Sequence, residues 1–186
     1  MIATINNLKK FHSPKLINFN SFNDKRGKFS RIFCINEFAK KGFNFSIKQI
    51  NHVVVNKKGT IKGMHFQVPP YSEIKVVNVI KGKIFDILID VRKDSKKFLN
   101  WKSFILNSKE NKCLLIPHGF AHGFQTLNDN CEIIYCHSEL YKSTKELSIN
   151  PFDPIVDISW PIKVSNISLK DKKTNFIYND FKSIVI

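Results

Sequence analysis

The sequence predicts a mainly β protein built as a sandwich or a closed barrel. Short segments rich in Ile, Val and Phe recur along most of the chain, and turn signals such as Lys58-Gly59 and Lys81-Gly82 separate them. One segment follows another at intervals of roughly 8–12 residues, which is typical of sandwiches and barrels. Helix signals are few by comparison.

Ten segments meet the description of a strand. They cover residues 15–19, 28–33, 47–55, 60–66, 74–79, 83–91, 101–106, 112–116, 119–126 and 132–137. Several alternate with the period of two that a strand requires. In 83–91, for example, Ile84, Asp86, Leu88 and Asp90 share one face, and the residues between them share the other.

Three short segments carry helix or turn signals. We expect a helix that Asn36 caps and that runs through Lys41, with Gly42 at its C-terminal end. Residues 144–147 are expected to form a further turn. Ser168 and Asp171 have the spacing of a capping box, which predicts a helix start.

Length and composition favour a single domain over residues 1–186. The chain has 186 residues, a mass of 21.6 kDa and 42% hydrophobic residues, which excludes a disordered protein. A chain of this mass buries roughly 70% of its surface on folding. We expect an N-terminal arm at about 1–45, a β-barrel core at about 46–140 and a C-terminal extension at about 141–186.

The sequence predicts a cytoplasmic protein. No apolar run approaches the ~20 residues of a membrane span, and residues 1–14 lack the apolar region of a signal peptide. The four cysteines show no CxxC spacing, which favours free thiols in a reducing compartment.

The formal net charge of +15 leaves three classes of partner open: nucleic acid, an anionic membrane and a small anionic substrate. The paired lysines are spread along the chain and no nucleic-acid motif accompanies them. We therefore expect neither a nucleic-acid nor a membrane partner.

The histidines do not predict a metal site. A typical β-barrel metal site would need two His separated by one residue, but Gly63 and Gln67 flank His65 at that spacing. Gly63 instead permits the close approach of a ligand or of another backbone. His118 and His122 share a face if their segment is a strand.

Acid–base chemistry is the second reading of these residues. Histidine is the residue type suited to moving protons near neutral pH, so His65 could act as a base, Lys75 could stabilise an enolate, and Tyr135 could act as an acid. Each also has an ordinary structural explanation: a satisfied strand His, a surface Lys and a core Tyr with its hydroxyl at the rim.

Six strings, taken together, point to a known family. They cover residues 24–29, 62–67, 75–82, 85–95, 116–124 and 157–161, in one order and with nearly the spacing of that family. The most specific is Ile116-Pro117-His118-Gly119-Phe120-Ala121-His122-Gly123-Phe124. From about residue 15 to about residue 175 the chain resembles the dTDP-4-dehydrorhamnose 3,5-epimerases.

The resemblance implies a fold, a reaction and an assembly. The fold is a cupin-like jelly roll, the site is free of metal and cofactor, and the protein is a homodimer that exchanges N-terminal strands. The substrate is a nucleotide-linked 4-keto-6-deoxy sugar of the dTDP-4-dehydro-6-deoxy-glucose type, used for cell-surface polysaccharide. Protons leave C3 and C5, beside the C4 ketone, and return from the other face.

The resemblance also implies residue roles. His65 matches the general base, and Asp171 matches the carboxylate that orients it. Lys75 matches the cation beside the C4 oxygen, and Tyr135 matches the acid on the opposite side. The substrate-binding residues that match are Arg26, Gln49, Asn51, Lys62, His122, Tyr141 and Lys170.

Several positions depart from the family pattern, mainly on the nucleotide side. Lys62 replaces an arginine, which keeps the charge but loses the bidentate fork. The others are Arg31, Asn78, His118, Leu140 and Ser72-Glu73-Ile74. Alternatives therefore stay open: a C3 or C5 epimerase of a GDP- or CDP-linked sugar, a 3,4-ketoisomerase, or a non-catalytic sugar-binding protein.

Overall fold

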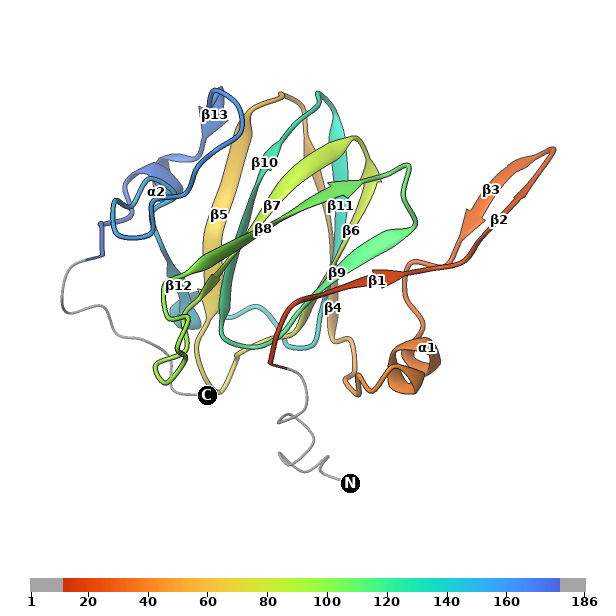
Figure 1. The fold of residues 1–186 in the computed structure, drawn as a ribbon, viewed down its shortest axis with the longest axis horizontal. Helices are drawn as coiled ribbons and strands as arrows, with labels where there is room; N and C mark the ends of the chain where they lie inside the picture. Colours follow the sequence, from red (N-terminus) through yellow and green to blue (C-terminus); the bar gives the residue numbers. More distant parts are fainter. Residues whose placement is uncertain (1–11, 178–186) are drawn as a thin grey trace.

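The structure is a computed structural model that describes residues 12–177. Figure 1 shows two facing β-sheets, a hairpin that projects from them and a C-terminal segment along one side. The prediction of a mainly β fold is confirmed. The start of the expected N-terminal arm (1–11) and the end of the expected C-terminal extension (178–186) lie outside the described residues.

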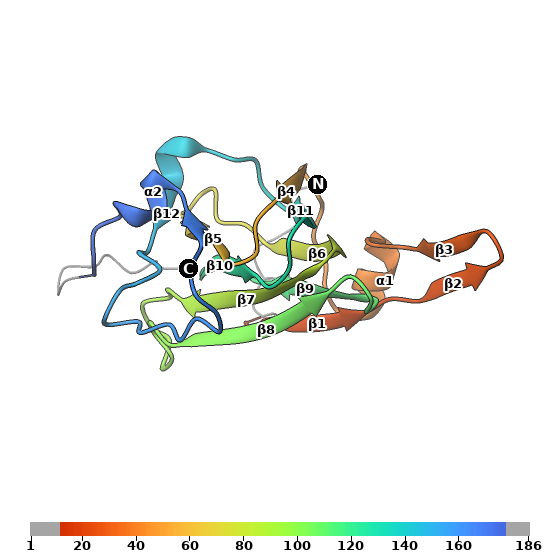
Figure 2. The ribbon, with the colours of Figure 1, turned by 90° about the horizontal axis from the view of Figure 1, so that it is seen from above.

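Each of the two facing sheets is formed by strands that are distant in sequence. The five-stranded sheet runs in the order β1 (Lys15–Asn18), β9 (Lys112–Ile116), β6 (Lys75–Lys81), β11 (Cys131–His137) and β4 (Gln49–Val55). The six-stranded sheet runs in the order β12 (Glu146–Ser148), β5 (Thr60–Gln67), β10 (Phe120–Thr126), β7 (Lys83–Asp90) and β8 (Trp101–Asn107), with β13 (Asn166–Ile167) parallel to β5. Seen from above, the two sheets form separate layers (Figure 2).

Apolar side chains fill the space between the sheets and cover both outer faces. The expected alternation in β7 is confirmed: Ile84 and Leu88 belong to the inner cluster, whereas Ile87 and Ile89 belong to a cluster on the outer face. That outer cluster includes Ile158 of the C-terminal segment. Sheets covered on both faces require strands that are apolar on both faces, as β7 is.

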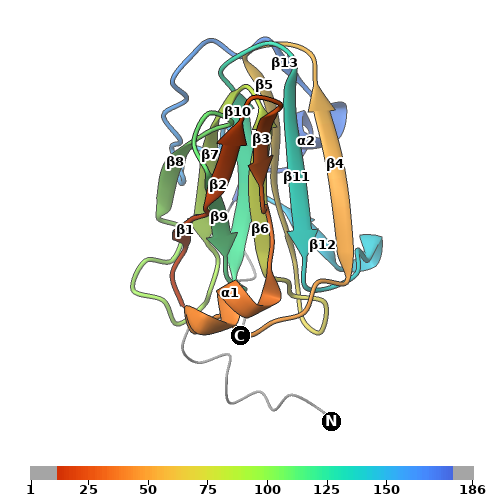
Figure 3. The same cartoon turned by 90° about the vertical axis from the view of Figure 1, so that its right-hand side faces the viewer.

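The N-terminal region differs most from the prediction. The expected strand at 28–33 is β3 (Gly27–Ser30), and it pairs with an unpredicted strand, β2 (Ser21–Asp24). Helix α1 (Ile35–Lys40) follows Cys34, so the prediction that Asn36 caps it is wrong. Phe38, the buried residue of α1, packs this helix against the outer face of the five-stranded sheet. Figure 3 shows α1 below this face and the hairpin in front of it.

The C-terminal segment returns to strand β5. The expected turn at 144–147 is a 3-10 turn over Ser143–Lys145 that leads into β12. Helix α2 (Leu169–Lys172) starts where predicted, because the hydroxyl of Ser168 accepts the Asp171 backbone N–H at 3.0 Å. The Asp171 side chain does not complete a capping box.

Two glycines bring β5 and β10 unusually close together. A Cβ on Gly63 would lie 2.6 Å from the His122 carbonyl oxygen, and a Cβ on Gly123 would lie 2.7 Å from the Lys62 carbonyl oxygen. Gly63 also has a φ of +103°, a conformation that L side chains rarely adopt. The expected close approach at Gly63 is therefore to another backbone.

Among residues 12–177, no helix is long and apolar enough to cross a membrane.

Candidate functional site

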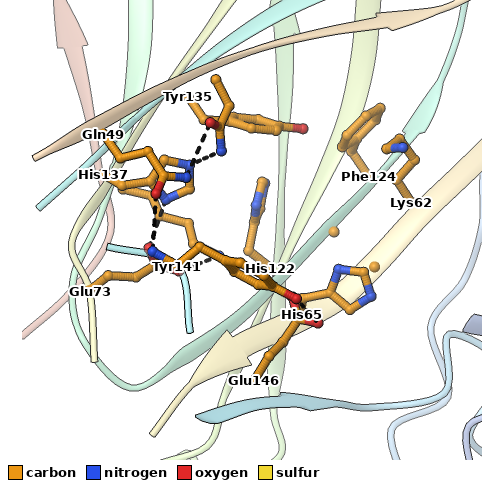
Figure 4. Close-up of a pocket in the computed structure, with 14 residues that line it drawn as sticks. Gln49, Lys62, His65, Glu73, His122, Phe124, Tyr135, His137, Tyr141 and Glu146 are labelled. Carbon is orange, nitrogen blue, oxygen red and sulfur yellow. Dashed lines mark hydrogen bonds and ion pairs between the residues drawn. The ribbon is translucent and has the colours of Figure 1, made fainter. Parts of the chain in front are cut away.

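A cavity of about 370 Å³ lies between the two sheets. Figure 4 shows its polar lining, with Tyr135, His122 and His65 reaching it from different strands. Its lining residues are Gln49, Asn51, Lys62, Gly63, His65, Glu73, Lys75, His122, Gly123, Phe124, Tyr135, His137, Tyr141 and Glu146. Eight of the eleven expected site residues are in this set.

Strand alternation explains how the five-stranded sheet supplies its share. On β11, Tyr135 and His137 are two residues apart and so share the inward face. His137 pairs in register with Lys75 on β6 and with Gln49 on β4. Tyr135 pairs in register with Asn51 on β4, two residues away along both strands from the pair of His137 and Gln49.

The six-stranded sheet supplies the opposite wall. His65 on β5 pairs in register with His122 on β10, and His122 pairs with Leu88 on β7. Each of the two histidines has a carboxylate behind it. The two imidazoles therefore lie beside each other on neighbouring strands of one sheet.

His65 is held by Asp171. The His65 Nε2 atom lies 2.7 Å from Asp171 Oδ1, and the Gly63 N–H donates to Asp171 Oδ2 at 3.3 Å. Burial alone would raise the pKa of Asp171, but the hydrogen bond to His65 and the attraction of its ring lower it. Asp171 is therefore a carboxylate at neutral pH, and it fixes the ring of His65.

A second dyad joins His122 to Asp86, a residue that the sequence analysis did not select. His122 Nε2 lies 2.9 Å from Asp86 Oδ2, and Asp86 is fully buried. Burial raises the pKa of Asp86, and its Oδ1 atom has no hydrogen-bond partner among the described residues. The available signal was a charged residue between Ile84 and Leu88, on the face of the strand that these two apolar side chains share.

Lys75 takes part in a third cluster that the sequence analysis also missed. Its Nζ atom lies 3.1 Å from Glu73 Oε1, and His137 Nδ1 lies 2.7 Å from Glu73 Oε2. The available signal for this cluster was that His137 follows Tyr135 by two residues, because two such residues of a strand lie on the same face.

Tyr135 lies between two imidazoles. Its ring meets His122 edge-on at a centroid distance of 5.8 Å and His137 at 6.1 Å. Burial and the nearby Asp86 carboxyl raise the pKa of Tyr135 well above 10, so the phenol keeps its proton at neutral pH.

The mouth of the cavity is polar and basic. Lys170 does not line the cavity, but its ammonium pairs with Glu146, which does. Lys170 also lines a neighbouring cavity of about 470 Å³, together with Lys57, Lys62 and His65. Lys62 and His65 border both cavities, so the two spaces adjoin.

Arg26 is not brought to this cavity within the protomer. It lies at the tip of the β2–β3 hairpin, where its side chain is 90% exposed and pairs with Asp24 at 2.6 Å. Arg31 and Asn78 line a separate cavity of about 360 Å³. Among residues 12–177, no group of three or more His, Cys, Asp or Glu side chains is arranged to hold a metal ion.

Comparisons with known proteins agree with this arrangement. A sequence profile of the family described as dTDP-4-dehydrorhamnose 3,5-epimerase matches residues 9–179. The chain belongs to this family. The dTDP-4-dehydrorhamnose 3,5-epimerase of Shigella flexneri is 34% identical over 172 residues, which are 91% of this chain and 93% of the relative.

Solved structures of epimerases from this family share the fold. The Bacillus anthracis dTDP-4-dehydrorhamnose 3,5-epimerase with TDP and PPi bound has a TM-score of 0.85 and 32% identity, over 95% of this chain and 98% of that one. The Legionella pneumophila dTDP-6-deoxy-D-glucose-3,5-epimerase, in complex with dTDP-4-keto-L-rhamnose, has a TM-score of 0.82 and 31% identity, over 88% and 87%. The expectation of a cupin-like jelly roll is confirmed.

Proposed function

We propose that this protein is a cofactor-independent isomerase that epimerises C3 and C5 of a dTDP-4-dehydro-6-deoxy-glucose type substrate, for cell-surface polysaccharide. One observation carries the proposal beyond family membership. His65 and Tyr135 belong to opposite sheets and line the same cavity, together with Lys75. A base and an acid on opposite walls suit removal of a proton from one face of a sugar and its return to the other.

The geometry supports a role for His65 as the general base. Because the Nε2 hydrogen bond to Asp171 engages one ring nitrogen, Nδ1 is the atom left to take a proton. The C–H bond beside the C4 ketone breaks, its proton moves to Nδ1, and its electron pair enters an enolate at the C4 oxygen. The Lys75 ammonium stabilises that oxygen.

Tyr135 completes the step from the other wall. Its phenol gives a proton to the carbanion carbon on the opposite face, and the C4 ketone re-forms as the electron pair returns to the new C–H bond. The Tyr135 phenolate then takes a proton from solvent. His65 releases to solvent the proton that it removed from the sugar. A positioned acid or base contributes roughly 10²–10⁴-fold to the rate.

The remaining predicted residues hold the substrate. Gln49, Asn51 and His122 line the sugar end of the cavity, with Tyr141 at its mouth. Lys62 and Lys170 border the adjoining space and suit the negative charge of a diphosphate. The enzyme would thus receive the sugar between the sheets and the nucleotide outside them.

Deuterium exchange tests this function. In D₂O, the protein should incorporate deuterium at C3 and C5 of dTDP-4-dehydro-6-deoxy-glucose, as followed by NMR. His65→Ala should abolish the exchange at both centres. His12→Ala is the matched control, since His12 is exposed and outside the cavity, and it should exchange at the wild-type rate.

Three results would contradict the proposal. Wild-type protein that exchanges neither the dTDP-linked sugar nor its GDP- and CDP-linked counterparts is not an epimerase of this class. An active His65→Ala variant would remove the base assigned here. A product with its ketone at C3, or with only one inverted centre, would identify a ketoisomerase or a single-centre epimerase.

We also propose that the protein acts as a homodimer that exchanges its N-terminal strands. Among the described strands, β2 and β3 pair only with each other, and Phe22 and Phe29 on them are 68% and 61% exposed. A two-stranded hairpin is marginally stable by itself, so these rings need a covering surface. A second copy would supply it and receive Arg26 near its own cavity.

Subunit complementation tests the exchange. The activity of the Arg26→Ala homodimer and of the His65→Ala homodimer is compared with that of a mixture in which subunits of the two variants have re-associated. If Arg26 serves the partner's cavity, each mixed dimer has one intact site and activity returns. If Arg26 serves its own cavity, or if the protein is monomeric by light scattering, the mixture stays as inactive as its components.

The cytoplasm is the compartment that the cysteines support. All four cysteines of the chain, Cys34, Cys113, Cys131 and Cys136, are free thiols. Free thiols are typical of reducing compartments. A fusion to a reporter that matures only in the cytoplasm would test this location.

A further inference from the structure

The cavity wall contains a buried carboxylate that the mechanism above does not use. Glu73 lies just before β6, and its side chain is 8% exposed. Both of its oxygens are engaged, Oε1 by Lys75 at 3.1 Å and Oε2 by His137 at 2.7 Å. A buried charge is costly unless it is fully paired, so this arrangement indicates that both partners are needed.

Glu73 is ionised in this setting. Burial alone would raise its pKa, but the charge of Lys75 and the hydrogen bond from His137 lower it below the ordinary value. The Lys75 side chain is itself 10% exposed. The wall of the cavity therefore contains a carboxylate and an ammonium that each depend on the other.

A single chain of hydrogen bonds continues from Glu73 to the mouth. Since His137 Nδ1–H donates to Glu73, its Nε2 is free to accept the amide of Asn51, 3.3 Å away. Asn51 Oδ1 in turn accepts Gln49 Nε2–H at 3.1 Å, and Gln49 Oε1 accepts the Tyr141 backbone N–H at 3.0 Å. Each hydrogen bond in the chain joins one donor to one acceptor, and because the Tyr141 backbone N–H can only donate, this order fixes both amides and the tautomer of His137.

This chain runs along one side of the cavity. Figure 4 shows Glu73, His137 and Gln49 together, on the side of His122 away from His65. The strand register explains the grouping, because His137 on β11 lies between Lys75 on β6 and Gln49 on β4. The carboxylate thus sets the position of an ammonium and, through His137, of two amides.

We propose that Glu73 and His137 are positioning residues for the epimerisation: they hold the Lys75 ammonium and the Asn51 and Gln49 amides in place before the substrate binds. The inference rests on the proposed function. A lysine has a long flexible side chain, and ordering it during the reaction would cost free energy. An ammonium already fixed at the enolate oxygen requires no such reorganisation in the transition state.

Glu73→Gln tests the proposal with little change in shape. Its single acceptor oxygen cannot serve both Lys75 and His137. We expect kcat to fall roughly tenfold or more, because Lys75 acts on charge that develops only in the transition state, and KM to rise by a smaller factor, because the Asn51 and Gln49 amides also hold the bound sugar. Glu110→Gln, which breaks the exposed pair with Lys112, is the matched control and should leave both constants unchanged.

Two variants of His137 provide a test that does not depend on Glu73→Gln folding. His137→Asn keeps an N–H donor near the position of Nδ1, whereas His137→Leu removes it. We expect His137→Asn to retain most of the wild-type kcat and His137→Leu to lose it to about the extent of Glu73→Gln. Equal kcat for all three variants and wild type would overturn the proposal while leaving the epimerase function intact.

Nitrogen NMR of the substrate-free protein separates failure of this inference from failure of the function. The network requires that His137 carry its proton on Nδ1 and none on Nε2, and this pattern should change in Glu73→Gln. A proton on Nε2 in the wild-type protein would overturn the network even if the enzyme is active. A wild-type protein with the expected tautomer but no turnover would instead overturn the proposed function, and the positioning role with it.

Discussion

Asp171 and His65 are separated by 106 positions in the sequence, yet their side chains meet at 2.7 Å on the border of two adjoining cavities. The contact is made where α2 lies beside β5. The Gly63 N–H donates to the same carboxylate. The orientation of the proposed base is thus fixed by the last described helix of the chain.

Replacement of Asp171 by Asn should keep the contact but remove its charge. The amide can present an N–H to the imidazole and stabilise the wrong tautomer, so we expect kcat to fall by about 10²–10⁴-fold. Steady-state kinetics and deuterium exchange measure this. Ser168→Ala, which loses the helix cap at a cost of ~1 kcal/mol but keeps the carboxylate, should keep most of the activity. Equal losses in both variants would mean that helix placement, not the carboxylate, matters.

Replacement of Tyr135 by Phe should separate exchange from inversion. Phe keeps the ring contacts with His122 and His137 but lacks the proton donor. We expect deuterium exchange at C3 to continue while full inversion is impaired, as read from the NMR spectrum of the product. Because burial raises the pKa of Tyr135 well above 10, ionisation of this phenol should not limit the wild-type enzyme between pH 6 and about pH 9. Normal inversion in the variant would exclude Tyr135 as the acid.

Asp90 predicts an acid-sensitive element of stability outside the site. Its carboxylate accepts Arg92 Nε at 2.8 Å and Ser95 Oγ at 2.6 Å. Burial alone would raise its pKa, but these bonds lower it. A carboxyl group with a depressed folded pKa stabilises the fold above its unfolded pKa of about 3.9, and this contribution is lost as the pH falls through the folded value.

Urea unfolding of Asp90→Asn checks this prediction. At about pH 7 the variant should be less stable than wild type by roughly 1.5–3 kcal/mol, the range for hydrogen bonds to charged groups. The difference should shrink as the pH is lowered towards about 3. A difference that stays constant with pH would show that the charge of Asp90 contributes nothing.

Replacement of Gly63 by Ala should destabilise the protein more than the same change at another glycine with positive φ. A Cβ at Gly63 would meet backbone atoms of His122 and Gly123 at 2.6 and 2.7 Å, whereas at Gly42 nothing lies within 4 Å. Gly42→Ala should cost about 1–2 kcal/mol from its backbone conformation alone. We expect Gly63→Ala to cost more than that, as measured by urea unfolding, and similar losses would argue against the close strand contact.

The strands of the core were predictable from sequence, because period-two alternation survives wherever a strand has two different environments. The segment 83–91 is the clearest case, with Ile84 and Leu88 in one cluster and Ile87 in another. Strands β2, β12 and β13 were missed. Strands β12 and β13 have three and two residues, too few side chains for a period to be recognised, and the four residues of β2 include one apolar side chain, Phe22.

The site was predictable only in part. His65, Lys75 and Tyr135 were candidates from their chemistry before the family resemblance supported them, whereas Asp171 came from the resemblance alone, because no local pattern could pair His65 with a carboxylate 106 positions later. Their neighbours Asp86, Glu73 and His137 were not selected, although strand alternation places two of them on inward faces. Partners that a fold brings together from different strands leave no spacing signal in the sequence.

The shortness of α2 determines which property the protein loses first when it begins to unfold. A helix of four residues is not stable by itself, so Asp171 stays beside His65 only while the C-terminal segment remains packed on the core. One contact that holds this segment is the hydrogen bond from the Asn150 amide to the Thr174 carbonyl at 2.6 Å. Segments held by few contacts open locally before a domain unfolds. Opening of this segment disconnects the imidazole from its carboxylate while both sheets stay folded. Catalysis should therefore be the first property lost on mild denaturation.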